Sequence, residues 1–115
     1  MVEYILDFDC WKVRILIITR IIHAPRPSTV DLLLRRTQKE AQQLVKNTHF
    51  AAIGLLQTDL PSLFYYTDIG QKAGNVIAIE ILGNCPQNLS TMAFFGSNEA
   101  VNATISAITA ADKQK

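Results

Sequence analysis

Val76-Ile-Ala-Ile-Glu-Ile-Leu82, Gly83-Asn-Cys-Pro-Gln-Asn88 and Leu89-Ser-Thr-Met-Ala-Phe-Phe95 follow one another in this sequence. The two outer runs are apolar and rich in strand-forming residues, and they predict two strands joined as a β-hairpin. The six residues between them are too many for a two-residue hairpin turn. Gly83 allows backbone angles that are closed to other residues, and Pro86 fixes its own. We therefore expect a specialised loop that holds Cys85 outward in one geometry.

A free cysteine in such a loop has two interpretations. The simpler one is a small apolar filler, because most free cysteines behave in this way. The other is a metal or cluster ligand, but one thiolate cannot hold a zinc ion or an iron–sulfur cluster by itself. Several copies of the loop that meet on a symmetry axis would supply the missing thiolates. The interpretation of Cys85 therefore depends on self-association.

Composition limits the possible classes of protein. The 115 residues include 49% hydrophobic and 18% charged residues, which predicts one folded domain, 1–115, rather than a disordered chain. A net charge of +1 argues against a nucleic-acid partner, and no apolar run is long enough to span a membrane. Cys10 and Cys85 do not form a secreted disulfide framework, and the acidic start does not resemble a signal peptide. We expect a cytosolic protein whose apolar surface is partly buried against other subunits.

Hydrophobic periodicity and capping residues predict the remaining elements. A half-buried strand is expected over residues 2–9, and a central strand, covered on both faces, over residues 12–22. Helices are expected from Ser28 or Thr29 to about Val45, over residues 60–73 and over residues 97–110, with another strand over residues 49–57. The order β, β, α, β, α, β, β, α predicts an α/β (α+β) fold, with helices packed on a mixed, mostly antiparallel sheet.

Two helical segments carry the most informative surfaces. The helix over residues 60–73, which Asp59 should begin and Gly74 should end, has apolar residues on two faces. We expect it to be buried on one side by its own sheet and on the other by a neighbouring subunit. On the preceding helix, a charged face is most simply a solvated surface; it consists of Arg35, Arg36, Lys39 and Glu40.

The sequence gives no positive indication of catalysis. It contains no phosphate loop, dinucleotide fingerprint or nucleophile elbow. His23 and His49 have no ligand partner at helical or hairpin spacing, so strand-end polar roles are the simplest interpretation. We therefore expect a protein that is not an enzyme.

Three stretches together resemble the bacterial microcompartment shell-protein (BMC) domain. Residues 52–56 and 68–76 resemble its first strand and helix, with the spacing D-x-x-x-K-A-x-x-V beginning at Asp68. Residues 95–108 resemble its second, glycine-initiated helix. Residues 23–27 resemble its P-R-P element, which in the usual family order follows the last strand but here precedes the first. The resemblance covers about residues 12–110 and implies a circularly permuted domain, with residues 12–48 as its last strand and helix, residues 49–110 as the remainder and residues 1–11 as an N-terminal extension.

This resemblance implies a cyclic homohexamer that tiles a microcompartment shell together with other shell proteins. Its pore would be lined by the hairpin loop, which consists of Gly83, Asn84, Cys85, Pro86, Gln87 and Asn88. The sequence G-N-C-P-Q further resembles the G-x-C-P loop of permuted shell proteins from glycyl-radical-enzyme microcompartments. That likeness implies a [4Fe-4S] cluster shared between subunits through Cys85, for electron transfer or cluster delivery. Here Asn88 follows the glutamine, where the subfamily often has glycine.

The same resemblance places Lys72 and Arg26 at the hexamer rim, in contact with the adjacent hexamer. The extension formed by residues 1–11 would contribute to a small barrel over the pore; the alternatives are that it pairs at the edge of its own sheet or is disordered. Two other functions remain open: a metal-free pore for small metabolites, and a regulatory oligomer that binds a ligand between subunits.

Overall fold

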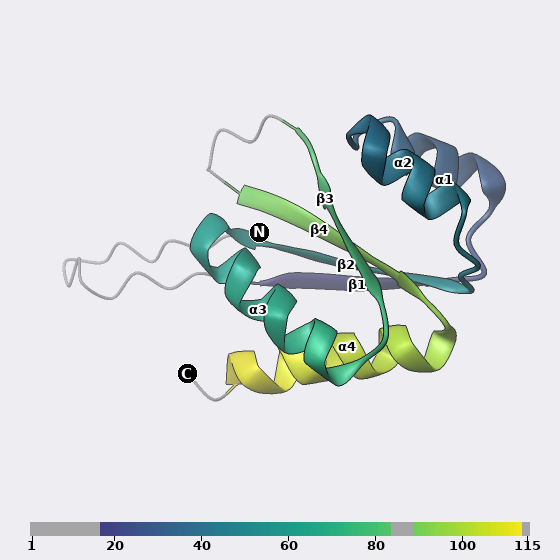
Figure 1. Ribbon diagram of the computed structural model, residues 1–115. Coiled ribbons are helices and arrows are strands. Elements are labelled where there is room, and N and C mark those ends of the chain that lie inside the picture. Colours follow the sequence, from purple (N-terminus) through teal and green to yellow (C-terminus); the bar gives the residue numbers. More distant parts are fainter. Residues whose placement is uncertain (1–16, 84–88, 114–115) are drawn as a thin grey trace.

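A computed structural model describes residues 17–83 and 89–113 of the chain. These residues form a four-stranded antiparallel sheet with two helices on each face (Figure 1). This α/β architecture confirms the predicted fold class. The elements in chain order are β1 Ile18–His23, α1 Pro27–Leu34, α2 Lys39–Lys46, β2 Ala52–Asp59, α3 Leu60–Ala73, β3 Ile77–Ile81, β4 Leu89–Gly96 and α4 Asn98–Lys113.

The spatial order of the strands is β1-β2-β4-β3. Strand β2 pairs with β1 from Ile18↔Gln57 to His23↔Ala52, and with β4 from Ala52↔Gly96 to Asp59↔Leu89. The two inner strands are thus β2 and β4, which come from distant parts of the sequence. Residues 12–16 of the predicted central strand lie outside the described residues, and within the described sheet β1 is an edge strand rather than a central one. Its apolar residues pack against the clusters on the two faces of the sheet, Ile21 on one face and Ile22 on the other. This packing does not require a neighbouring strand at both edges of β1.

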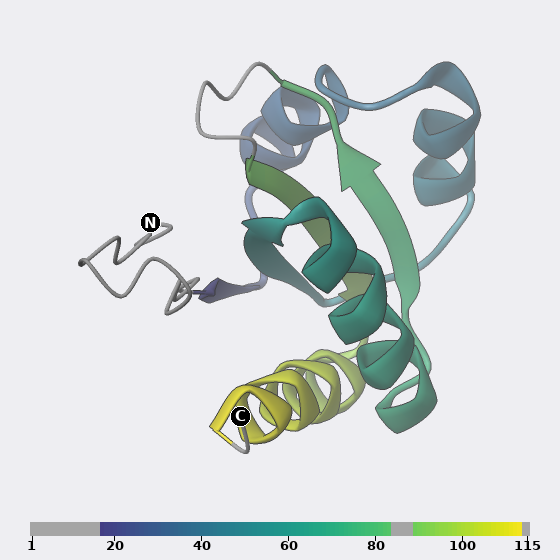
Figure 2. The same cartoon turned by 90° about the vertical axis from the view of Figure 1, so that its left-hand side faces the viewer.

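Side-chain alternation divides the core into two layers, one on each face of the sheet. The face under α3 and α4 carries the larger cluster, in which Leu56 and Phe94 of the sheet meet Leu63, Tyr66 and Ile105 of the helices. The opposite face carries a second cluster under α1 and α2. That cluster contains Leu34, Val45, Ile53, Ile79, Ala93 and Phe95 as buried residues. Figure 2 shows the two helix pairs on opposite sides of the sheet in a second view.

Helices α3 and α4 approach each other closely at Gly70, within α3, and at Gly74, which caps its end. The hydroxyl of Thr104 donates a buried hydrogen bond of 3.0 Å to the carbonyl oxygen of Gly70. A Cβ at Gly70 would lie 2.7 Å from Thr104 Cγ2, and one at Gly74 would lie 2.6 Å from Thr104 Oγ1. Glycine is therefore required here by close packing of two helices, not by an unusual backbone angle. Asp59 begins α3 as predicted, with its carboxylate accepting from the Ser62 amide at 3.4 Å.

The predicted single helix from Ser28 or Thr29 to about Val45 is two helices, and the N-cap prediction was also wrong. Helix α1 begins earlier, with Arg26 as N-cap and Pro27 at the first helical position, where proline is pre-organised. It ends at Leu34, because the Thr37 hydroxyl donates to the Leu34 carbonyl oxygen at 2.7 Å. The Gln42 side chain also donates to that carbonyl oxygen, at 2.9 Å. Together with the Thr37 amide, which donates to the same oxygen at 3.1 Å, these side-chain donors satisfy the Leu34 carbonyl oxygen where the helix ends.

Candidate functional site

The predicted hairpin is present. Strands β3 and β4 pair antiparallel from Ile77↔Phe95 to Ile81↔Thr91, and the connection between them begins at Gly83. Residues 84–88, with Asn84, Cys85, Pro86, Gln87 and Asn88, lie outside the described residues, as do Cys10 and the predicted strand over residues 2–9. The site can therefore be built from the described residues at the base of this connection.

The base of the connection is held by the segment between α1 and α2. The amide of Leu82 donates to the carbonyl oxygen of Arg36 at 2.6 Å. Arg36 Nη1 lies 3.9 Å from the position that a Cβ on Gly83 would occupy. None of the glycines in the described part of the chain has a positive φ, so the special backbone angle expected of Gly83 is not adopted. An end of the hairpin is thus fixed by a contact with a segment almost fifty residues earlier.

A small pocket lies at this contact. Its lining combines the Arg36 side chain with polar groups of the sheet, and the Gln57 side-chain amide donates to the Thr91 hydroxyl at 3.2 Å. Gln57 and Thr91 are paired on neighbouring strands, β2 and β4. Sequence reasoning missed these three residues. Gln57 and Thr91 interrupt apolar strands and could have been noticed, but Arg36 was indistinguishable from a solvated cation until the helix break was known.

The outer face of α3 is the most apolar exposed surface among the helices described. Its inner face buries Leu63 and Tyr66, whereas Leu60, Phe64 and Tyr65 are 45%, 58% and 63% exposed in the isolated chain. Apolar residues thus occupy two sides of α3, but they divide differently from the prediction, which placed Leu63 with Phe64 and Tyr65 with Tyr66. Residues 17–83 and 89–113 of one chain leave the second face exposed.

The two predicted rim residues lie on the surface of different elements. Lys72 stands in the last turn of α3 and forms an ion pair with Asp68 at 2.6 Å, with the two side chains 76% and 63% exposed. The hydrogen bond from Lys72 to Asp68 raises the pKa of the lysine above its ordinary value. Arg26 is the exposed N-cap residue of α1. The structure of one chain does not bring these residues into a common site.

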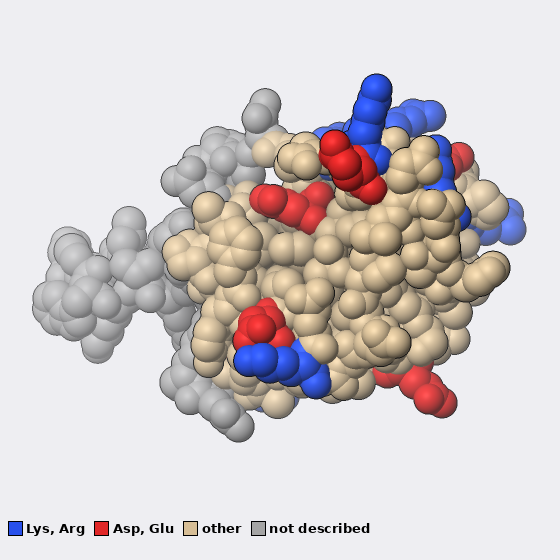
Figure 3. All heavy atoms as spheres, in the orientation of Figure 1, with Lys and Arg blue, Asp and Glu red and all other residues tan. Residues whose placement is uncertain are grey.

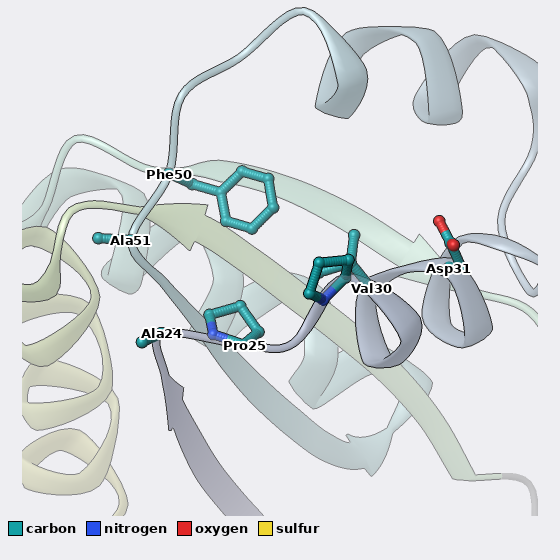
Figure 4. Close-up of a pocket in the computed structure, with 7 residues that line it drawn as sticks. Ala24, Pro25, Val30, Asp31, Phe50 and Ala51 are labelled. Atoms are coloured by element: carbon teal, nitrogen blue, oxygen red, sulfur yellow. The ribbon is translucent and has the colours of Figure 1, made fainter.

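A second pocket, of about 410 Å³, lies between the end of β1 and the start of α1. In Figure 4 the rings of Pro25 and Phe50 and the Val30 side chain border it, with Asp31 at one side. Phe50 in turn stacks edge-on against Phe95 of the core, with ring centroids 5.1 Å apart. No group of three or more histidine, cysteine or acidic side chains that could hold a metal occurs in residues 17–83 and 89–113. Val30 and Phe50 both line the pocket and pack against the smaller core, so the pocket lies over that core.

Charge is divided unevenly between the two parts of the described chain. Between residues 17 and 50, two acids, Asp31 and Glu40, are outnumbered by the six cations Arg20, Arg26, Arg35, Arg36, Lys39 and Lys46. Between residues 51 and 113 the balance reverses, with cations Lys72 and Lys113 against acids Asp59, Asp68, Glu80, Glu99 and Asp112. In Figure 3 blue atoms gather over α1 and α2. The helix pair beside the Arg36 pocket is therefore the basic side of the molecule.

Solved structures similar to this chain include two GrpU microcompartment shell proteins. The GrpU microcompartment shell protein from Pectobacterium wasabiae, in its ligand-free structure, is 33% identical over 80% of this chain and 99% of its own, with a TM-score of 0.66. The ligand-free GrpU shell protein from Clostridiales bacterium 1_7_47FAA is 27% identical over 80% of this chain and 87% of its own, with a TM-score of 0.59. No protein-family model matches the chain. No curated protein matches its sequence. No helix in the described part of the chain has the length and hydropathy needed to cross a bilayer.

Proposed function

The chain belongs to the microcompartment shell-protein family that includes the GrpU proteins, and we propose from this premise that it forms cyclic homohexamers. It is a structural shell protein, and association with itself and with other shell components follows from that role. The hexamers would tile the shell, with the connection between β3 and β4 at the central pore. Circular permutation of the domain is part of the proposal. It is supported by β1, α1 and α2, which precede the β2–α3 unit in the sequence but pack beside it.

The observation that carries the proposal is the uncovered apolar face of α3. An aromatic side chain buries about 150–250 Å² when fully enclosed, so the exposed parts of Phe64 and Tyr65 leave about 100 Å² each. At about 25 cal/mol per Å², covering these two rings would stabilise each subunit contact by roughly 5 kcal/mol. That is an upper estimate, since immobilising the side chains opposes it. An apolar face of this kind is typical of a subunit contact.

The hexamer is tested by replacing Phe64 with aspartate. The expected result is a shift from hexamer to smaller species in light scattering coupled to gel filtration, at micromolar protein concentration. Leu32→Asp is the matched control, because Leu32 is 59% exposed but lies on α1. It should leave the hexamer intact. A wild-type chain that is monomeric under these conditions would refute the assembly, and equal effects of both variants would show that α3 is not the contact.

The pore is further proposed to hold a [4Fe-4S] cluster through Cys85, for electron transfer or cluster delivery. The support is the Gly83–Asn88 sequence together with the hairpin, whose two strands begin and end at this connection. Six symmetry-related copies of Cys85 would supply the thiolates that one chain lacks. A cubane cluster takes about four ligands and has no six-fold symmetry, so only some of the six cysteines could bind it.

The cluster is tested by purifying the protein without oxygen and recording its visible spectrum and iron content. Broad absorption that bleaches with dithionite is expected, and Cys85→Ser should remove both the colour and the iron while the hexamer persists. Cys10→Ser is the matched control and should keep them. Full iron content in Cys85→Ser after anaerobic reconstitution would leave the other proposed function, a metal-free pore for small metabolites.

A further inference from the structure

We propose that the pocket at the base of the β3–β4 connection binds a small oxyanion, a phosphate or a carboxylate, through the guanidinium of Arg36. The pocket is formed within one chain, so this proposal goes beyond the shell role and depends on neither the hexamer nor the cluster. Its volume is about 190 Å³. That equals about six water molecules at about 30 Å³ each, which suits a small ion rather than a large cofactor. It is lined by Arg36, Gln57, Ile81, Leu82, Gly83, Leu89 and Thr91.

The charged group in the described lining of the pocket is the Arg36 guanidinium, which only donates hydrogen bonds. No carboxylate of the described residues lines the pocket, and these residues give Arg36 no ion-pair partner. The Thr91 hydroxyl already accepts from the Gln57 amide at 3.2 Å, so its own hydrogen is available for another acceptor. The second hydrogen of the Gln57 amide also remains available. An oxyanion is the ligand that can accept from a guanidinium and a hydroxyl together, and arginine binds such planar or tetrahedral oxyanions through paired hydrogen bonds.

The position of Arg36 is fixed by its backbone. Its carbonyl oxygen accepts from Leu82 at 2.6 Å, and its amide donates to Leu33 at 3.0 Å. The next residue, Thr37, is held by its bond to Leu34 at 2.7 Å. A guanidinium that extends from a fixed backbone loses less conformational freedom on binding than one on a loose segment. The surrounding residues 17–50 carry an excess of cations, which raises the local concentration of anions.

The test titrates the full-length protein into inorganic phosphate at low, constant ionic strength and follows the ³¹P signal. A parallel titration uses ¹³C-labelled malonate. Binding of either probe that weakens at least about tenfold in Arg36→Gln would support the site and identify the oxyanion class. Arg35→Gln is the matched control, because Arg35 is an exposed cation next to Arg36 that does not line the pocket. It should change binding by less than about twofold, as expected for a general charge effect.

Thr91→Val separates hydrogen bonding from charge. It keeps the shape of the side chain and the net charge of the protein, and it should weaken binding severalfold if the hydroxyl donates to the anion. Equal losses of binding affinity in Arg35→Gln and Arg36→Gln would overturn the proposal. The proposal would also be overturned if neither phosphate nor malonate bound at tens of millimolar. Light scattering of the same samples keeps the two proposals distinguishable, because a monomer that binds phosphate would refute the hexamer and support the pocket.

Discussion

Gly74→Ala is expected to destabilise the protein because of the contact between α3 and α4. A Cβ at this position would overlap the carbonyl oxygen of Ala100 and lie 2.6 Å from Thr104 Oγ1. Since a backbone oxygen cannot rotate away, the two helices would have to separate. Overpacking of this kind typically costs about 1–3 kcal/mol, and a clash with backbone belongs near the upper end. The lower entropy of the unfolded alanine chain offsets about 0.4–1 kcal/mol of this.

The net loss of about 2 kcal/mol corresponds to roughly 8 °C in Tm for a chain of this size. Thermal unfolding followed by circular dichroism, at one fixed protein concentration, measures it. Gly83→Ala is the control: among the described residues the nearest atom to its Cβ would be Arg36 Nη1 at 3.9 Å. Its φ is not positive, so its Tm should stay within about 3 °C of wild type. A Gly74→Ala protein as stable as Gly83→Ala would show that the two helices do not meet as described.

Other expected outcomes concern the lattice, the core and the extension. Lys72→Ala should abolish extended sheets in electron microscopy while hexamers persist, with little change in Tm because its ion pair with Asp68 is exposed; unchanged sheets would refute a rim role. Thr104→Val removes the buried bond to Gly70 and should cost about 1–3 kcal/mol in denaturant unfolding, whereas an unchanged midpoint would show that this bond contributes nothing. Deleting residues 2–9 should lower hexamer stability if they form a barrel. No change in stability would favour the alternatives, in which they pair at the edge of their own sheet or are disordered.

The parts of the fold that could be predicted from the sequence are those determined by residues close together in the chain. Asp59 begins a helix and Gly74 ends it through local capping and close packing, and alternating apolar residues indicated β3 and β4. The edge position of β1 could not be predicted in this way, because it depends on which strands pair across the whole chain. Its β-branched residues are equally suitable for an inner strand.

The base of the connection illustrates the same limit for the site. Arg36 occupies a position that helical periodicity assigns to solvent, and only the break after Leu34 directs it towards the hairpin. At the break, the Thr37 and Gln42 side chains donate hydrogen bonds to the Leu34 carbonyl oxygen, in competition with continuation of the helix. Tertiary contacts, such as the bond from the Leu82 amide to Arg36, can decide between these two conformations. Local patterns therefore predicted the hairpin but not the pocket beside it.

The position of α4 after all four strands in the sequence has a consequence for synthesis on the ribosome. Val101, Ile105 and Ile108 complete the larger core, and they lie in a helix that emerges after the sheet it covers. Until residues 98–113 have left the exit tunnel, the sheet face beneath them stays open to water and to other nascent chains. Neighbouring copies on one polysome would then be at risk of premature aggregation. We expect chaperones that bind exposed apolar segments to engage this chain until α4 has emerged, before any subunit can assemble.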